Sequence, residues 1–199
     1  MEHDMSSALI FDCDGTLTDS MPLHFICWHK TMTSYGLVFD EERFYSLGGM
    51  PTGKIIAMLS EEQGVKVNVE QAAIDKENAF LDMLHQLEPI APIVNIAKES
   101  KGIKPISVAS GGYREIVMKQ LAAIGIHDLF DAIVTAEDTT KHKPEPDVFL
   151  EAAHRMKTKP SECIVYEDSD LGIEAARRAG MKWVDVREVH RPRRITGTF

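Results

Sequence analysis

The sequence predicts an α/β protein built on a doubly wound, mainly parallel sheet, with a helical segment inserted near its start. Two observations predict this class. Short runs of apolar and β-branched residues recur along the 199-residue chain, and most precede a polar loop and a helical pattern. One long stretch after the first run has helical periodicity without a convincing strand. With 44% hydrophobic residues, the chain can bury a substantial core.

Five apolar runs are the expected strands. They occupy residues 8–11, 106–109, 132–136, 163–166 and 183–186. Helical patterns follow the second and fourth runs, over residues 114–125 and 171–180. Gly125 and Gly180 lie where these helices are expected to end, since glycine commonly follows a helix C-terminus. Alternation of strands and helices places helices on both faces of a parallel sheet.

The inserted segment is expected to be helical throughout. Its patterns cover residues 21–36, 54–64 and 69–87. We therefore place the α/β core at residues 1–18 and 90–199, and the insertion at residues 19–89. Asp19 is a candidate cap for the helix that enters the insertion, and Asp170 for the helix that begins at Leu171.

Composition excludes several classes of protein. The formal net charge of −9 argues against a protein that binds nucleic acid or a membrane surface. Three scattered cysteines without C-x-x-C spacing suggest neither a disulfide framework nor a zinc site. The acidic N-terminus resembles no signal peptide, and no apolar run is long enough to span a membrane. We expect a cytoplasmic monomer acting on a small molecule, with the basic residues 191–194 as a solvated end.

Open parallel sheets bind ligands beyond the carboxyl ends of their strands, so the residues after each run are candidate site residues. The first run is followed by Asp12, Asp14, Gly15 and Thr16, and the second by Ser110, Gly111 and Gly112. The third run is followed by Lys141 and Lys143, and the fourth by Glu167, Asp168 and Asp170. These residues supply carboxylates, hydroxyls, backbone amides and lysines.

Several carboxylates in one crevice require a cation. Two unit charges about 4 Å apart cost roughly 4 kcal/mol at a surface-like dielectric. Oxygen ligands in a small site favour Mg²⁺, which binds a few carboxylates together with water and phosphate oxygens. Ser110, the amides around Gly111, and Lys143 would complete a phosphate cradle. Together these features predict phosphoryl chemistry.

The same residues resemble the four motifs of the haloacid dehalogenase superfamily. DCDGTLTDS is similar to the first motif, Ser110 in VASGG to the second, Lys143 in KHKPEPDVF to the third, and Glu167 with Asp168 to the fourth. The insertion resembles the small helical cap of a subgroup that includes β-phosphoglucomutase and many sugar-phosphate phosphatases. GGMPTGKI and KHKPEPDVF are similar to fructose-1-phosphatase-like members. The resemblance implies a Rossmann-like core carrying a cap.

The resemblance also implies roles. Asp12 would attack phosphorus to form an aspartyl-phosphate, and Asp14 would protonate the leaving alcohol and later deprotonate water. For Asp14 to act as an acid, its pKa must rise or the closing cap must desolvate it. The expected Mg²⁺ ligands are Asp12, the Asp14 backbone carbonyl and Asp168, with Glu167 as a ligand or an outer partner. Thr16, Ser110, Gly111 and Lys143 are the expected phosphate-binding residues. An acidic residue at position 14 disfavours dehalogenation, because a halide leaves without a proton.

Within the cap, four polar residues are predicted to face the substrate: His24, Thr52, Lys54 and Lys76. His24 lies one helical turn from Trp28, so packing against the core is an open alternative for it. Phosphoglucomutase-like members carry an arginine in the cap loop, whereas SLGGMPTGK has none.

The predicted function is therefore a Mg²⁺-dependent phosphatase of a small sugar phosphate. A β-phosphoglucomutase-like mutase is the alternative, and a phosphate-binding module without catalysis is a third hypothesis.

Overall fold

A computed structural model describes residues 8–195 of the chain. Within this range the strands form one five-stranded parallel sheet in the order β3-β2-β1-β4-β5. Their bounds are Ala8–Phe11 (β1), Ile106–Ala109 (β2), Ala132–Val134 (β3), Cys163–Glu167 (β4) and Lys182–Asp185 (β5). All five overlap the expected runs, so the predicted parallel α/β class is confirmed.

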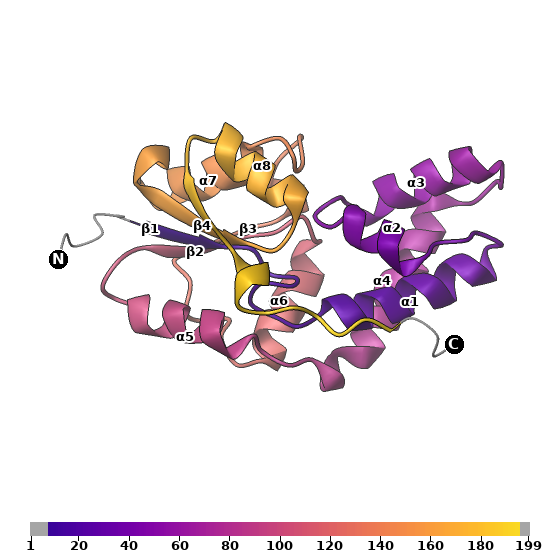
Figure 1. Cartoon of the computed structure of the whole chain (residues 1–199), viewed down its shortest axis with the longest axis horizontal. Helices are drawn as coiled ribbons and strands as arrows, with labels where there is room; N and C mark the ends of the chain where they lie inside the picture. The colour runs from indigo at the N-terminus through magenta and orange to yellow at the C-terminus, as the bar shows by residue number, and fades with distance from the viewer. Residues whose placement is uncertain (1–7, 196–199) are drawn as a thin grey trace.

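Helices cover both faces of the sheet. They are α5 (Ala91–Ser100), α6 (Arg114–Ala123), α7 (Asp147–Arg155) and α8 (Asp170–Arg178). Helices α7 and α8 lie on one face, and α5 and α6 on the other (Figure 1). Alternate residues of β1 enter the two apolar clusters, Ile10 in one and Phe11 in the other. Burial on both faces explains why the strands are continuous apolar runs.

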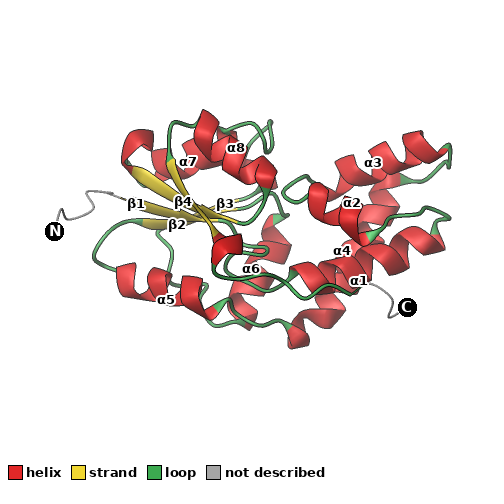
Figure 2. Ribbon diagram, viewed as in Figure 1, coloured by secondary structure: helices red, strands yellow, loops and turns green. Residues whose placement is uncertain are grey.

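The inserted segment forms a separate lobe, which we call the cap. It contains α1 (Met21–Ser34), α2 (Glu41–Ser46), α3 (Thr52–Gln63) and α4 (Val69–Met83). These helices lie beyond the ends of the strands (Figure 2) and share an apolar cluster that includes Phe25, Trp28 and Ile56. The chain crosses between the lobes twice. The crossings run side by side, with Asp19 N donating to Glu88 O at 2.9 Å and Ile90 N to Leu17 O at 3.0 Å.

The predicted helix ends need two corrections. Gly125 and Gly180 follow α6 and α8 with φ of 70° and 71°, as expected. The predicted caps Asp19 and Asp170 are wrong, because Ser20 and Ser169 hold the N-cap positions. The Ser169 hydroxyl accepts from Gly172 N at 3.0 Å, while Asp170 lies in the first turn, where a carboxylate is also favourable.

The basic residues near the C-terminus are exposed, yet they are not detached from the fold. The Arg194 guanidinium lies 3.5 Å over the Tyr45 ring of the cap, and Ile195 N donates to Glu41 Oε1 at 2.7 Å. The expectation of a merely solvated end is therefore incomplete for this segment. Across residues 8–195, the helices are too short or too polar to cross a bilayer.

Candidate active site

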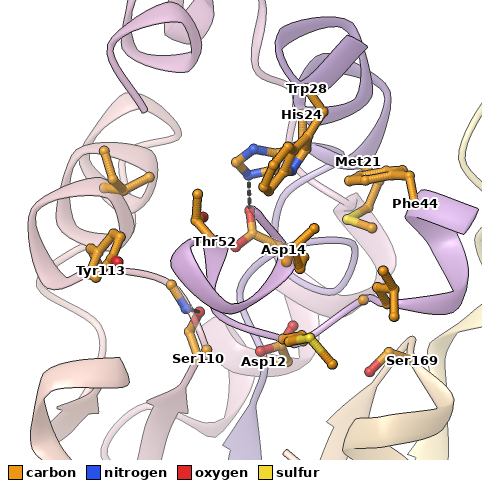
Figure 3. Close-up of a pocket in the computed structure, with 18 of the residues that line it drawn as sticks. Asp12, Asp14, Met21, His24, Trp28, Phe44, Thr52, Ser110, Tyr113 and Ser169 are labelled. Carbon is orange, nitrogen blue, oxygen red and sulfur yellow. Dashed lines mark hydrogen bonds and ion pairs between the residues drawn. The ribbon is translucent and has the colours of Figure 1, made fainter. Parts of the chain in front are cut away.

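Three neighbouring strands, β2, β1 and β4, deliver their following residues to one cavity beneath the cap. Asp12 follows β1, Ser110 follows β2, and Asp168 follows β4. Asp14 lies between Asp12 and Ser110 on the core side and His24 on the cap side (Figure 3). The cavity has a volume of about 90 Å³.

The floor of the cavity contains three carboxylates, and a lysine lies directly behind them. Oxygens of Asp12, Glu167 and Asp168 lie within 4.8 Å of one another. The buried Lys143 Nζ lies 2.8 Å from Asp12 Oδ1 and 2.7 Å from Glu167 Oε2. Lys143 therefore points into the site, as predicted, whereas Lys141 is exposed.

The cluster carries more negative charge than one ammonium can balance. Burial, together with repulsion from Glu167, raises the pKa of Asp12 to about 8 despite the attraction of Lys143. Burial, together with repulsion from Glu167 and Asp12, also raises the pKa of Asp168 well above its usual range. Burial opposes the charge of Lys143, but Asp12 and Glu167 outweigh it and raise the pKa of the ammonium.

This donor set fits a divalent cation. Asp12, Glu167 and Asp168 offer hard oxygen ligands, which Mg²⁺ and Ca²⁺ prefer. A cation among them would also lower the cost of ionising all three in a buried site. The residues at the end of β4 are well placed to hold such an ion.

Hydrogen bonds and close approaches fix the two carboxylates after β4. Glu167 Oε1 accepts from Ser169 Oγ at 2.7 Å and from Ser169 N at 3.0 Å. Thr16 Oγ1 donates to Asp168 Oδ1 at 3.3 Å. Gly15 has φ +75°, and a Cβ there would lie 2.1 Å from Asp168 Oδ2. Glycine is therefore required at position 15 for both the turn and the contact.

Asp14 has surroundings of the opposite kind. Its Oδ1 accepts from Ser20 Oγ at 2.6 Å, His24 Nε2 at 2.8 Å and Gln120 Nε2 at 2.9 Å. Burial acts to raise the pKa of Asp14, but the His24 side chain and these hydrogen bonds outweigh it and hold the pKa well below its usual range. Of the two predicted conditions for Asp14 to act as an acid, a raised pKa is not met in this arrangement, and desolvation by a closing cap stays a prediction.

Three of the four predicted cap residues join a chain of contacts that ends at Asp14. Lys76 Nζ lies 3.0 Å from His24 Nδ1 and 3.2 Å from Glu77 Oε1, and Thr52 Oγ1 donates to Glu77 Oε1 at 2.6 Å. Because a carboxylate only accepts, His24 donates from Nε2 to Asp14. His24 also stacks on Phe80, with ring centroids 3.7 Å apart. His24 therefore both packs against Phe80 and contacts Asp14.

Lys54 is the exception among the predicted cap residues. It is exposed and does not line the cavity, whereas Thr52 and Ile55 of the same helix do. Residues two apart point to different sides of a helix, which explains why Lys54 turns away from the site that Thr52 faces. The structure therefore does not bring Lys54 to the cavity with the other predicted cap residues, and its contact with substrate stays a prediction.

The expected phosphate cradle is formed only in part. Ser110 and Gly111 line the cavity, and Ser110 Oγ accepts from Gly112 N at 3.0 Å. A Cβ at Gly111 would lie 2.6 Å from Gly49 O, so the cap loop is seated directly on this glycine. Thr16 is fully buried and does not line the cavity. Its hydroxyl contacts Asp168, and its contact with phosphate stays a prediction.

Sequence reasoning missed four polar residues that the fold brings to this site. They are Ser20, Glu77, Gln120 and Ser169. One signal was available for Gln120, because it occupies the apolar face of α6 with Ile116, Val117 and Leu121. A polar residue at an expected core position needs a partner. The sequence alone does not reveal which one.

Comparisons with known proteins agree with this geometry. The family model of haloacid dehalogenase-like hydrolases matches residues 9–186. The chain is 39% identical to the fructose-1-phosphate phosphatase YqaB of Escherichia coli, over 93% of this chain and 98% of that protein. It is 28% identical to a β-phosphoglucomutase of Bacillus subtilis, over 90% of this chain and 82% of that one.

A solved structure supports the same assignment. A β-phosphoglucomutase of Clostridium difficile superposes with a TM-score of 0.82 at 26% identity, covering 90% of this chain and 83% of that one. The matched residues span the sheet, the carboxylate cluster and the cap. The chain therefore belongs to the family of haloacid dehalogenase-like hydrolases.

Proposed function

We propose that this protein is a Mg²⁺-dependent phosphatase that hydrolyses a small sugar phosphate through an aspartyl-phosphate. The observation that carries the proposal is the convergence of Asp12, Glu167 and Asp168 beside Lys143 and the Ser110 loop, at one cavity. Asp12, Glu167 and Asp168 would hold the ion, which would neutralise charge on the phosphate and on the attacking carboxylate. The excess negative charge of the cluster supports a bound cation.

Asp12 is the proposed nucleophile. One carboxylate oxygen of Asp12 forms a bond to phosphorus while the bond from phosphorus to the sugar oxygen breaks, and the leaving oxygen takes a proton from Asp14. Water then attacks the aspartyl-phosphate, Asp14 takes a proton from it, and inorganic phosphate leaves. Lys143, 2.8 Å from Asp12 Oδ1, supplies positive charge next to the reacting group.

Asp14 would begin this cycle as a carboxylate, because its pKa is depressed in the absence of substrate. A phosphate dianion placed against it raises the pKa by like-charge repulsion, and a monoanionic ester brings a proton of its own. Binding of substrate would thus convert Asp14 into an acid. Once it has given its proton to the leaving alcohol, Asp14 is again a carboxylate and can take a proton from water.

The cavity and the relatives together suggest the substrate class. The walls combine apolar side chains, including Met21, Trp28 and Ile55, with the polar Thr52. YqaB, to which the chain is 39% identical, is named as a fructose-1-phosphate phosphatase. We therefore propose a phosphorylated monosaccharide or a metabolite of similar size.

The mutase alternative rests on the similarity to β-phosphoglucomutases. A mutase must hold a second phosphate in the cap. Among the described residues that line the cavity, Lys76 is the single lysine or arginine, and its Nζ already contacts Glu77 and His24. Hydrolysis is therefore favoured. Formation of glucose 6-phosphate from β-glucose 1-phosphate, with little free phosphate, would instead establish the mutase.

A panel of sugar phosphates, assayed for released phosphate with Mg²⁺ and with EDTA, tests the proposal. We expect turnover only with the metal, and none by Asp12→Asn. Asp128→Asn is the matched control, because Asp128 is an exposed aspartate of a core loop. Full activity of Asp12→Asn, or no release of phosphate from any substrate by the wild type, would contradict the proposal.

A further inference from the structure

Gln120 joins the catalytic pocket to the crossing between the lobes, although no motif includes it. Its side chain on α6 is fully buried. The Nε2 atom lies 2.9 Å from Asp14 Oδ1, and the Oε1 atom lies 2.8 Å from Thr18 Oγ1. Thr18 belongs to the crossing, where it pairs with Pro89. One amide thus connects Asp14 to the crossing between the lobes.

The chemistry of the partners fixes how the Gln120 amide is oriented. A carboxylate only accepts, so the amide nitrogen must face Asp14. The amide oxygen then faces the Thr18 hydroxyl, which can donate to it. The reversed amide would place two acceptors against each other at Asp14. Gln120 therefore donates to Asp14 whatever the pH, since a primary amide does not titrate in the working range.

The three donors to Asp14 come from different parts of the molecule. Ser20 and His24 belong to the start of the cap, at the N-cap and within α1. Gln120 belongs to the core helix α6, which packs against the sheet. Gln120 is thus the donor that does not depend on the position of the cap.

All three donors contact the same oxygen. Ser20, His24 and Gln120 bind Oδ1, and within residues 8–195 no donor contacts Oδ2. A Cβ at Gly112 would lie 3.7 Å from Oδ2, which places this oxygen beside the glycine loop after β2. That loop lines the cavity. The carboxylate is therefore anchored by one oxygen and presents the other to the cavity.

We propose that Gln120 is a positioning residue that fixes the Asp14 carboxylate from the core side, so that Oδ2 exchanges the proton with the leaving oxygen. This inference rests on the proposed phosphatase function. The proton on Oδ2 moves to the sugar oxygen as the phosphorus–oxygen bond breaks, and its electron pair remains on Asp14. Gln120 itself neither gives nor takes a proton.

Packing alone does not explain a glutamine at this position. Burying an amide costs free energy unless both of its ends are hydrogen-bonded. Methionine has a similar length and no such requirement. If Gln120 were replaced by methionine, the Thr18 hydroxyl would still have an acceptor in Cys13 O at 3.1 Å, and Asp14 would keep Ser20 and His24. A change in catalysis without loss of the fold is therefore the expected outcome.

The test compares kcat/KM of Gln120→Met on two substrates, since kcat/KM reports the steps up to release of the leaving group. A sugar phosphate needs a proton from Asp14, whereas p-nitrophenolate leaves without one. We expect kcat/KM for the sugar phosphate to fall about 10- to 100-fold, while kcat/KM for p-nitrophenyl phosphate changes by less than about threefold. Lys119→Met is the matched control, because Lys119 is the exposed neighbour on the same helix.

Thermal unfolding of each variant separates positioning from stability. An unchanged Tm with selective loss on the sugar phosphate supports the inference. Equal loss on both substrates, or no loss on either, overturns it, whatever the Tm. A wild type that hydrolyses no phosphomonoester defeats the proposed function itself, so the two failures are distinguishable.

Discussion

Asp12 and Asp14 are two residues apart, yet the structure places them in opposite electrostatic surroundings. Asp12 lies among carboxylates, with Lys143 as its hydrogen-bonded cation, and its pKa is raised to about 8. Asp14 accepts three hydrogen bonds, and its pKa is lowered. Pairs of carboxyl groups whose surroundings separate their pKa values are typical of enzymes that assign them different tasks. The surroundings differ because Asp12 lies among carboxylates that lack enough positive charge, whereas Asp14 already accepts three hydrogen bonds.

The largest expected effect comes from removing the proton-transferring group. Asp14→Asn should lower kcat by about 10²- to 10⁴-fold, since an amide cannot act as an acid or a base. With p-nitrophenyl phosphate, a burst of p-nitrophenolate should remain, because Asp12 can still be phosphorylated. Rapid-mixing measurements check this, with Asp170→Asn as the control, since the Asp170 side chain is 88% exposed. Loss of the burst together with turnover would show that Asp14 is needed for the attack of Asp12.

Removing the cation beside Asp12 tests the other half of the comparison. Lys143→Met should lower kcat by about 10²- to 10³-fold, as loss of a charged donor does elsewhere. It should also destabilise the metal-free protein by about 3–5 kcal/mol, because buried carboxylates lose their partner. Assays and thermal unfolding in EDTA measure both effects. Lys141→Met, an exposed neighbour, should change neither. An equally stable Lys143→Met would show that Lys143 does not offset negative charge in the metal-free cluster.

Binding of Mg²⁺ should stabilise the carboxylate cluster specifically. At about 100 times the dissociation constant, the ion would add about 2.7 kcal/mol to the free energy of unfolding. For a chain of this length, that corresponds to a Tm increase of roughly 5–10 °C. Thermal unfolding with Mg²⁺ or EDTA measures the shift. The shift should be lost in Asp168→Asn and kept in Asp170→Asn, and an equal shift in both would place the ion elsewhere.

The smallest effects are changes of stability with pH, and they should have opposite signs for the two aspartates. The folded protein keeps a proton on Asp12 up to about pH 8, whereas the unfolded chain loses it near 3.8, so this group costs stability as the pH rises between those values. In EDTA, Asp12→Asn should therefore gain more Tm relative to wild type at pH 8 than at pH 5.

Asp14 contributes in the opposite sense. Its folded pKa is depressed, so its stabilisation is present above the unfolded pKa and is lost as the pH falls through the folded one. Asp14→Asn should lower Tm at pH 5 and pH 8 alike, with the difference closing only in strongly acidic solution. Unfolding scans at both pH values check the pair. If Tm relative to wild type changed in the same direction in Asp12→Asn and Asp14→Asn, the surroundings of the two aspartates would not be electrostatically opposite.

Much of the core site follows from sequence pattern, because parallel strands place their carboxyl ends at one edge of a sheet. Asp12, Ser110, Lys143 and Asp168 each follow a predicted strand, directly or through a short loop, and the structure brings them together. The cap was less predictable. Lys54 and Lys76 both lie on helices, but only the packing of α3 and α4 turns one outward and buries the other.

The residues around Asp14 were the hardest to foresee. Gln120 is 106 positions away from it in the chain, and Lys76 is 52 positions away from His24. Their contacts depend on the crossing of the lobes and on how α6 meets the sheet, which no local pattern encodes. The direction of the Asp14 pKa shift depends on these contacts.

By itself, the sequence determined the class of fold, the helical insertion and the identity of the charged residues at the strand ends. These features arise from local periodicity and from the geometry of parallel sheets. Only the tertiary structure decided which carboxylate keeps a proton, which cap side chains reach the cavity, and which oxygen of Asp14 remains open to it. Electrostatics and hydrogen bonding depend on distances of a few ångströms between segments far apart in the chain, and folding alone sets those distances.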